Sequence, residues 1–214
     1  MKKWILVILI LMYVLLTRPL RENKRKVFDN FLTPDECKRM IRLIKHKVDA
    51  GLYRQRQENE DGEQQIFDMY EFKDEQVNDI RRRVDNMIKT HFDKNAHIES
   101  SYMKVRVAGK SGFAHPPHVD TCEYNTTTKE CPIGPKSDHW LSHSVLIYLN
   151  SCDGGDFFFD DGKVVKPEPG RMLAFTSGTE NVHGVNRIKR GDRYAIAIWF
   201  TKDPDKIEQY ARHE

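Results

Sequence analysis

The stretch RMLAFTSGTENVHGVNRIKRGDRYAIAIWF, residues 171–200, decides the fold class. Short apolar runs lie near its two ends, and each has the length of one β-strand. Between them, Gly178, Gly184 and Gly191 stand among Ser, Thr, Asn and Asp residues that are typical of turns. Short strands separated by turns, with no helical pattern between them, predict an antiparallel sandwich or barrel.

The same pattern extends back to about residue 100. In SYMKVRVAG (101–109) polar and apolar residues alternate, so Tyr102, Lys104 and Arg106 share one face of a predicted strand. Further strands are expected in the runs HSVLIYLN (143–150), DFFF (156–159) and KVV (163–165). Gly154 and Gly155 predict a tight turn before the second of these runs. Trp199 and Phe200 are expected to fill the core.

Residues that precede this region have helical periodicity. In FLTPDECKRMIRLIKHKVDAG (31–51), Thr33 is a suitable N-cap, Pro34 fits the first helical position and Glu36 completes a capping box. Gly51 is a natural end for this helix. We therefore expect an α+β chain in which helices come first and strands follow.

A second helix is expected from about Lys73 to His91, where apolar residues recur at helical spacing. Its run Arg81-Arg82-Arg83 spreads around the helix and indicates a solvated face rather than a phosphate site. The polar stretch RQRQENEDGEQQ (54–65) predicts a surface loop, and the charged residues 204–214 predict a peripheral tail. The net charge of +3 and the dispersed basic residues argue against a nucleic-acid partner.

The N-terminal segment is the one strongly hydrophobic part of the sequence. The run WILVILILMYVLL (4–16) carries no charge but is shorter than the about 17–25 residues of an ordinary spanning helix. It predicts an uncleaved signal-anchor, with a cleaved signal peptide as the alternative, and residues 17–26 as a basic tether. Both interpretations place the rest of the chain in the secretory lumen, although the basic tether favours the cytosolic side by the positive-inside tendency.

Four cysteines also favour an oxidising compartment. Cys122 and Cys131 bracket a polar loop and could close it with a disulfide, whereas four buried thiols are the alternative. The same loop contains Asn125-Thr126-Thr127, an acceptor pattern for N-glycosylation. We expect a single-pass type II membrane glycoprotein that faces the lumen of the endoplasmic reticulum or Golgi.

The segment HPPHVD (115–120) offers metal ligands. In an extended segment, residues i and i+2 point the same way, so His118 and Asp120 can face a common centre. His183, which follows the predicted strand RMLAFTS, is the candidate for a second imidazole. Two His and one carboxylate on one face of an octahedral ion are the ligand set of non-haem iron(II) oxygenases.

Arg193, a cationic residue ten positions after His183, could bind the second substrate of such an oxygenase. Enzymes of this kind chelate a 2-oxo acid whose far carboxylate needs a cation, and the planar fork of Arg suits it. Arg193 opens an otherwise apolar strand, where an Arg is unusual without a partner. The segment VNRIKRGD (185–192) predicts a hairpin that would bring Arg193 beside the strand that leads to His183.

Three stretches carry a family resemblance: HVDTC (118–122), WLSHSVLIYLNSCDGGDFFFDDG (140–162) and PGRMLAFTSGTENVHGVNRIKRGDRYAIAIWFT (169–201). They resemble the catalytic domain of 2-oxoglutarate- and iron(II)-dependent prolyl hydroxylases. The likeness is greatest to the prolyl 3-hydroxylase (leprecan) group, through LIYLN, GGDFFF and SGTENVHGV. It covers about residues 100–203, and the N-terminal anchor is more like small transmembrane members of the wider prolyl 4-hydroxylase-like group.

The resemblance implies a double-stranded β-helix (jelly-roll) core with the N-terminal helices packed on it. It implies iron(II), 2-oxoglutarate, O₂ and ascorbate as cofactors, and hydroxylation of a peptidyl residue, with proline of a secretory-pathway protein favoured and a collagen-like substrate possible. By position, His118, Asp120 and His183 match the iron ligands and Arg193 matches the 2-oxoglutarate anchor. Tyr102, Arg106 and Tyr148 are candidates to contact 2-oxoglutarate.

Two other functions are open at this point. One is a non-catalytic lumenal binding protein on the same fold, and the other is a zinc-dependent hydrolase that uses His115 and His118. Pro116 and Pro117 between those two histidines disfavour a shared helical face. The expected organisation is a signal-anchor and tether (1–26), a helical support region (27–98), a jelly-roll dioxygenase domain (99–203) and a charged tail (204–214).

Overall fold

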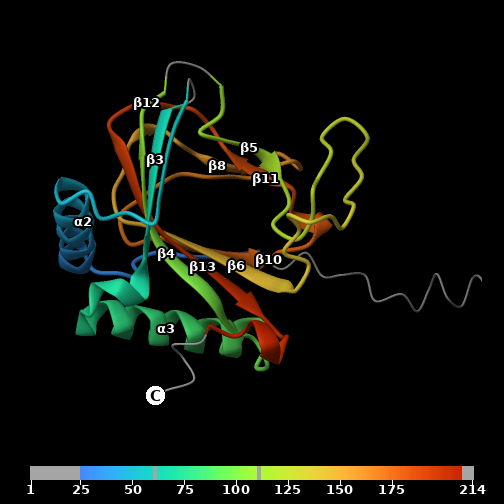
Figure 1. Cartoon of the computed structure of the whole chain (residues 1–214), viewed down its shortest axis with the longest axis horizontal. Coiled ribbons are helices and arrows are strands. Elements are labelled where there is room, and N and C mark those ends of the chain that lie inside the picture. The colour runs from blue at the N-terminus through green and yellow to red at the C-terminus, as the bar shows by residue number, and fades with distance from the viewer. Residues whose placement is uncertain (1–24, 60–61, 110–111, 209–214) are drawn as a thin grey trace, which may run out of the picture.

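The structure is a computed structural model that describes residues 25–59, 62–109 and 112–208 (Figure 1). Its described part has two α-helices, α2 (Pro34–Asp49) and α3 (Glu75–His91), as expected. No helix in those ranges is long and apolar enough to span a bilayer. The predicted signal-anchor, residues 4–16, lies outside the described residues.

The larger of the two main sheets is antiparallel. Its strands, in spatial order, are β1 (Arg25–Phe28), β10 (Met172–Thr176), β6 (Leu141–Tyr148), β13 (Asp192–Thr201), β4 (His97–Val107), β3 (Gly62–Asp68) and β2 (Gln55–Asn59).

The smaller antiparallel sheet lies against one end of the larger one (Figure 1). It contains β5 (His115–His118), β11 (His183–Val185), β8 (Phe157–Phe159) and β9 (Val164–Val165) in that order. A two-stranded piece pairs β12 (Ile188–Arg190) with β7 (Asp153–Gly154), and short 3₁₀ helices lie at η1 (Met69–Phe72), η2 (Thr179–Asn181) and η3 (Pro204–Lys206). Two antiparallel sheets packed in this way are typical of a double-stranded β-helix.

Successive side chains along each strand point to opposite faces of the sheet, and this divides the buried apolar residues into two hydrophobic clusters. On β13, Ile196, Ile198 and Phe200 pack toward the helices, whereas Arg193 and Trp199 face the space between the sheets. The cluster between the sheets contains Tyr148, Phe157, Phe159, Val165, Leu173, Phe175 and Val185. A register shift of one residue in β13 would bury Arg193 among the helices, so this register also fixes the interior of the site.

Both helices cover the outer face of the larger sheet, away from β5, β8 and β11 (Figure 1). The predicted capping box of α2 is present: Thr33 accepts from the backbone of Glu36, whose side chain accepts from the backbone of Thr33. An N-cap of this kind contributes about 1 kcal/mol. Helix α3 begins after Asp74, and the run of arginines on it makes ion pairs within the protein, including Arg83 with Glu36.

Three expectations for the flanking regions were wrong. Residues 55–59 and 62–65 are not loop but belong to β2 and β3, which pair with each other and extend the larger sheet beyond β4. Arg25 and Lys26 are not tether, because they pair with β10 as part of β1. Glu208 is not peripheral, since its buried carboxylate pairs with Arg81. Each departure comes from polar side chains that find partners far away in the sequence, which local patterns do not reveal.

Candidate active site

Strand pairing brings the predicted ligands together. His118 at the end of β5 is the register partner of His183 at the start of β11, and Asp120 lies two residues beyond His118. The Nε2 atoms of His118 and His183 lie 3.5 Å and 3.8 Å from Oδ1 of Asp120. One ligand atom from each of the three residues lies within 4.8 Å of the others, and no other His, Cys, Asp or Glu of the described residues joins the group.

Hydrogen bonds fix which nitrogen of each imidazole faces the centre. Nδ1 of His118 lies 2.9 Å from the carbonyl oxygen of Pro116, and Nδ1 of His183 lies 2.8 Å from that of Asn181. Carbonyl oxygens only accept, so each Nδ1 carries the proton and each Nε2 presents a lone pair to the Asp120 carboxylate. Lone pairs that converge on an anion repel one another unless a cation lies between them, so the donor set fits a divalent metal.

Burial and hydrogen bonding define the charge of the carboxylate. Burial by itself raises the pKa of Asp120, but His183, His118 and the Ser144 hydroxyl lower it overall to far below its usual range. The Ser144 hydroxyl donates to Oδ2 of Asp120 at 2.5 Å and lies 2.7 Å from Ser177. Burial, opposed by Asp120, lowers the pKa of His183 to about 4, so its imidazole is neutral and able to bind metal at pH 7.

A residue of the expected tether supports His183. The guanidinium of Arg25 stacks 3.7 Å from the centre of the Phe159 ring and donates to the Asn181 side chain and the Glu180 carbonyl. Asn181 in turn donates to the backbone carbonyl of Thr176 at 2.7 Å. These contacts fix η2, whose Asn181 carbonyl orients the His183 ring. No local pattern around Arg25 indicated this role.

A cavity of about 400 Å³ opens beside the three ligands, and Arg193 lines it. This volume lies within the range of small-molecule sites. Only 4% of the Arg193 surface is exposed, and its Nε donates to the carbonyl of Gly155 at 3.2 Å. Gly155 has φ +70°, and a Cβ there would lie 3.1 Å from Cδ of Arg193, so glycine is required beside this side chain.

Two polar atoms at this end of the cavity, Nη2 of Arg193 and the hydroxyl of Tyr148, have no hydrogen-bond partner among the described residues. The Tyr148 ring is fully buried on β6, 5.0 Å from the guanidinium carbon of Arg193. Burial raises the pKa of Tyr148 to about 12, against the influence of Arg193. Two buried donors left unpaired are costly, and a carboxylate would accept from both, so they fit one end of 2-oxoglutarate.

The predicted hairpin before Arg193 was wrong. Residues 188–190 pair with β7 instead, and β13 then joins the larger sheet between β4 and β6. Arg193 therefore lies on the larger sheet, and His183 on the smaller one faces the same cavity. Both residues line one cavity, but the path between them crosses from one sheet to the other.

Strand β4 supplies three side chains to the site. Lys104 and Arg106 line the cavity with Arg193, and Arg106 is the register partner of Arg193. Tyr102, expected near 2-oxoglutarate, lines a separate cavity of about 340 Å³ together with Trp199 and Asp120. Trp199 was expected in the core but lines both cavities. The alternation in residues 101–109 was the signal that could have identified Lys104.

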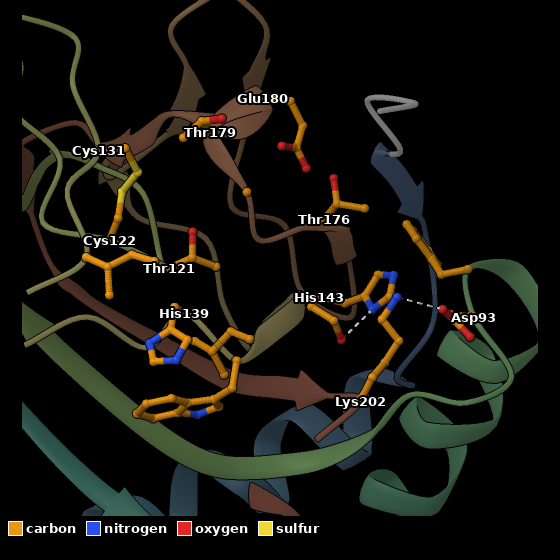
Figure 2. A pocket seen from close by; sticks show the side chains of 16 residues that line it. Asp93, Thr121, Cys122, Cys131, His139, His143, Thr176, Thr179, Glu180 and Lys202 are labelled. Carbon is orange, nitrogen blue, oxygen red and sulfur yellow. Dashed lines mark hydrogen bonds and ion pairs between the residues drawn. A yellow bond between two sulfur atoms is a disulfide. The ribbon is translucent and has the colours of Figure 1, made fainter. Parts of the chain in front are cut away.

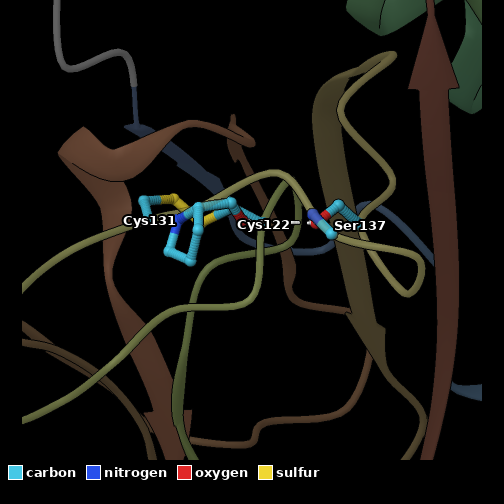
Figure 3. Close-up of a disulfide and its surroundings, with 5 residues drawn as sticks. Cys122, Cys131 and Ser137 are labelled. Carbon is cyan, nitrogen blue, oxygen red and sulfur yellow. Dashed lines mark hydrogen bonds between the residues drawn. A yellow bond between two sulfur atoms is a disulfide. The ribbon is translucent and has the colours of Figure 1, made fainter.

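The segment between β5 and β6 projects from the sheets and is closed by the predicted disulfide, Cys122–Cys131, whereas Cys37 and Cys152 are free (Figures 1 and 3). Ser137 secures the segment beyond the disulfide, because its hydroxyl accepts from the backbone of Gly134 at 2.8 Å. Figure 2 shows a cavity of about 790 Å³ beside this disulfide. Cys122 lines both this cavity and that of Arg193, so the two are neighbours across the Asp120 segment.

His115 is the remaining sequence candidate. Its ring packs edge-on against that of His118 with centroids 4.1 Å apart, and burial lowers its pKa to about 2. It is not among the three residues whose ligand atoms converge. The sequence did not indicate that Ser144 would donate to Asp120 or that the carbonyl of Gly155 would accept from Arg193. A serine at the buried position 144 of an otherwise apolar strand was the signal that could have identified the first of these contacts.

Comparison with known proteins agrees with this geometry. Residues 100–201 match the family model described as 2OG-Fe(II) oxygenase superfamily. The chain is 30% identical to human (Homo sapiens) prolyl 3-hydroxylase 3 over 90% of its own length, which corresponds to 31% of that relative. It is 37% identical to mouse (Mus musculus) prolyl 3-hydroxylase 2 over 59% of its length and 20% of the relative's. The chain therefore spans a third or less of the curated relatives it matches.

Solved structures show the same fold. A viral collagen prolyl hydroxylase from Paramecium Bursaria Chlorella virus-1, in complex with 2OG, superposes with a TM-score of 0.58 at 19% identity, over 84% of this chain and 96% of that one. A prolyl-4-hydroxylase from Pseudomonas putida gives 0.60 at 20% identity, over 86% and 95%. With its ligand triad at the paired ends of β5 and β11 and its family match over residues 100–201, the chain contains a region of the 2OG-Fe(II) oxygenase type and is prolyl 3-hydroxylase-like.

Proposed function

We propose that this protein is a 2-oxoglutarate- and iron(II)-dependent dioxygenase that hydroxylates a peptidyl residue, with proline favoured. One observation carries the proposal: two imidazole Nε2 atoms and one carboxylate oxygen converge beside a cavity whose far end holds unpaired donors of Arg193 and Tyr148. Metal ligands and hydrogen-bond donors for a carboxylate, both lining one cavity, suit a keto-diacid that chelates the metal.

The bound iron and 2-oxoglutarate supply the oxidation chemistry, and the protein supplies position and environment. Pro116 and Asn181 keep the Nε2 lone pairs of His118 and His183 directed inward. Ser144 holds one oxygen of Asp120, leaving Oδ1 toward the histidines. Arg193 would neutralise the distal carboxylate of 2-oxoglutarate, and the buried aromatic rings around it would exclude water, which would strengthen each of these interactions.

A peptide substrate follows from the prolyl hydroxylase names of the relatives and of the solved structures. The cavities on either side of the Asp120 segment, shown in part in Figure 2, give room for residues that flank the reacting one. Ascorbate as reductant and a collagen-like sequence as substrate remain part of the proposal. So do the lumenal location, the membrane anchor in residues 4–16 and glycosylation of the exposed Asn125, which a disulfide-closed loop favours.

The test uses the purified chain with iron(II), 2-oxoglutarate and O₂, and follows succinate and the mass of proline-containing peptides. We expect succinate formation that depends on iron(II), and a peptide mass increase of one oxygen. His118→Ala and Arg193→Ala should abolish both while thermal unfolding remains cooperative. Succinate formation at the normal rate by His118→Ala would refute the metal assignment.

Two results would support other functions instead. Metal binding without 2-oxoglutarate turnover indicates a binding protein on this fold. Hydrolysis that depends on zinc and is lost in His115→Ala indicates a zinc-dependent hydrolase.

A further inference from the structure

The cavity beside the candidate metal centre holds more positive charge than the proposed reaction requires. Lys104, Arg106 and Arg193 all line it. Among the described residues, neither Lys104 nor Arg106 has an ion pair or a side-chain hydrogen bond. The other charged residues in its walls are Asp120, which faces the metal position, and the exposed pair Lys136 and Asp138, which offset each other.

Strand register orders these cations along the cavity. Arg106 lies opposite Arg193, at the end where 2-oxoglutarate is expected, whereas Lys104 lies opposite Ala195 nearer the other end. The Lys104 ammonium leans further that way, because Nζ lies 4.3 Å from the centre of the Trp199 ring. Trp199 also lines the adjoining cavity with Tyr102, so Lys104 lies on the side from which a substrate would approach.

Charge balance leaves this lysine without a counterion in the loaded site. With Lys104 protonated, Lys104, Arg106 and Arg193 carry three positive charges, and iron(II) with Asp120 would add one more. The two carboxylates of 2-oxoglutarate would cancel two, so about two positive charges would remain in a cavity where Lys104 and Arg106 are partly buried. Such a space favours a further anion, because an unpaired buried charge is costly.

Electrostatics on Lys104 itself agree with this account. Burial, then Arg106 and Arg193, lower the pKa of Lys104 to about 7, while Asp120 acts in the opposite direction. An anion beside the ammonium would restore its charge. The small side chain of Ala197 on β13, which lines the same cavity, leaves room for that group.

We propose that Lys104 is a specificity residue that binds a carboxylate of the substrate, so that the preferred peptide carries an Asp, a Glu or its free C-terminus close to the hydroxylated residue. This inference rests on the proposed function and deepens it. It assigns Arg106 to the 2-oxoglutarate end of the cavity and Lys104 to the substrate end.

The test compares short proline-containing peptides in which Gln is replaced by Glu at one position at a time, each with a free or an amidated C-terminus. Peptide Kd is measured by calorimetry on the iron(II)- and 2-oxoglutarate-loaded chain without O₂. We expect Glu at one position, or the free C-terminus, to tighten binding about tenfold, as for a partly desolvated charge pair. Comparison of the two C-terminal forms separates the two sources of the carboxylate.

Variants of Lys104 then assign the effect. Lys104→Met should remove the preference for the acidic peptide, and Lys104→Arg should retain most of it. The 2-oxoglutarate Kd should stay within about twofold of wild type in both. Lys166→Met, which removes an exposed lysine outside the site, is the matched control and should change neither constant.

Three results would overturn the proposal: equal affinity for all Gln and Glu peptides, an acidic preference that survives Lys104→Met, or a 2-oxoglutarate Kd that rises as much as the peptide Kd. Failure of the proposed function looks different. In that case the wild-type chain supplied with iron(II) does not bind 2-oxoglutarate or makes no succinate, whereas the peptide comparison between wild type and Lys104→Met still measures the role of the lysine.

Discussion

Replacing Tyr148 by Phe should change stability and ligand affinity in opposite directions. The Tyr148 hydroxyl is buried and without a hydrogen-bond partner, beside the unpaired Nη2 of Arg193. A buried polar group left unpaired costs about 1–3 kcal/mol. Removing the hydroxyl should therefore raise the unfolding free energy of the ligand-free protein by about 1 kcal/mol, after allowance for the small void. For a chain of this size, that raises Tm by about 2–4 °C.

With 2-oxoglutarate bound, the same hydroxyl has a carboxylate to donate to. Hydrogen bonds to charged groups contribute about 1.5–3 kcal/mol. Tyr148→Phe should therefore weaken 2-oxoglutarate about 10- to 150-fold, since each 1.4 kcal/mol is a factor of ten. The stabilisation that saturating 2-oxoglutarate gives to wild type should shrink by the same free energy.

The assays are thermal and urea unfolding with and without 2-oxoglutarate, and calorimetric titration of the iron(II)-loaded protein without O₂. Tyr194→Phe is the matched control, because Tyr194 is also buried but its hydroxyl donates to Asp192 at 3.3 Å. The control should lose about 0.5–1.5 kcal/mol of stability and keep its 2-oxoglutarate affinity. The reasoning fails if Tyr148→Phe destabilises the ligand-free protein as the control does, or leaves the 2-oxoglutarate Kd unchanged.

Three further predictions concern neighbouring groups. Arg25→Met should lower the iron(II) affinity about 10- to 100-fold in a metal titration, because Asn181, whose carbonyl orients the His183 ring, loses its contact with Arg25. An unchanged iron(II) affinity would show that Arg25 does not support His183. Gly155→Ala should cost about 1–3 kcal/mol of stability and should also weaken 2-oxoglutarate binding. The control Gly162→Ala should cost stability alone, because Gly162 has φ +87° but no atom lies within 4 Å of its added Cβ. Equal losses of 2-oxoglutarate binding in the two variants would contradict the contact between position 155 and Arg193. The folded-state pKa of Tyr148 is raised to about 12, so between pH 10 and 12 the unfolded state releases the phenol proton before the folded state does. Relative to its value below pH 10, the unfolding free energy of wild type should therefore fall by about 2 kcal/mol more than that of Tyr148→Phe over this range in urea unfolding, and parallel curves would refute the shift.

The sequence by itself determined the strand-rich half, both helices and a candidate ligand set whose three side chains converge in the structure. Alternation in residues 101–109 and 171–200 predicts strands because side-chain direction along a strand is a local property. The Thr33 capping box is local as well, and the structure contains it. His118, Asp120 and His183 were identified because their spacing and order are those of a metal site, and the disulfide because two cysteines bracket one loop.

Only the tertiary structure decided how these pieces meet. The sequence of the β2–β3 hairpin suggests a polar loop. It forms strands because β3 pairs with β4, and only there do its glutamines line the cavity. Arg25 gains its role from Asn181, far along the chain, and Arg193 reaches the cavity by a crossing between sheets rather than by a hairpin. Propensity and periodicity depend on neighbours in sequence, whereas burial of a charge depends on what the folded chain places beside it. For that reason the sequence indicated the candidate metal ligands, but not that Lys104 would share their cavity without a counterion among the described residues.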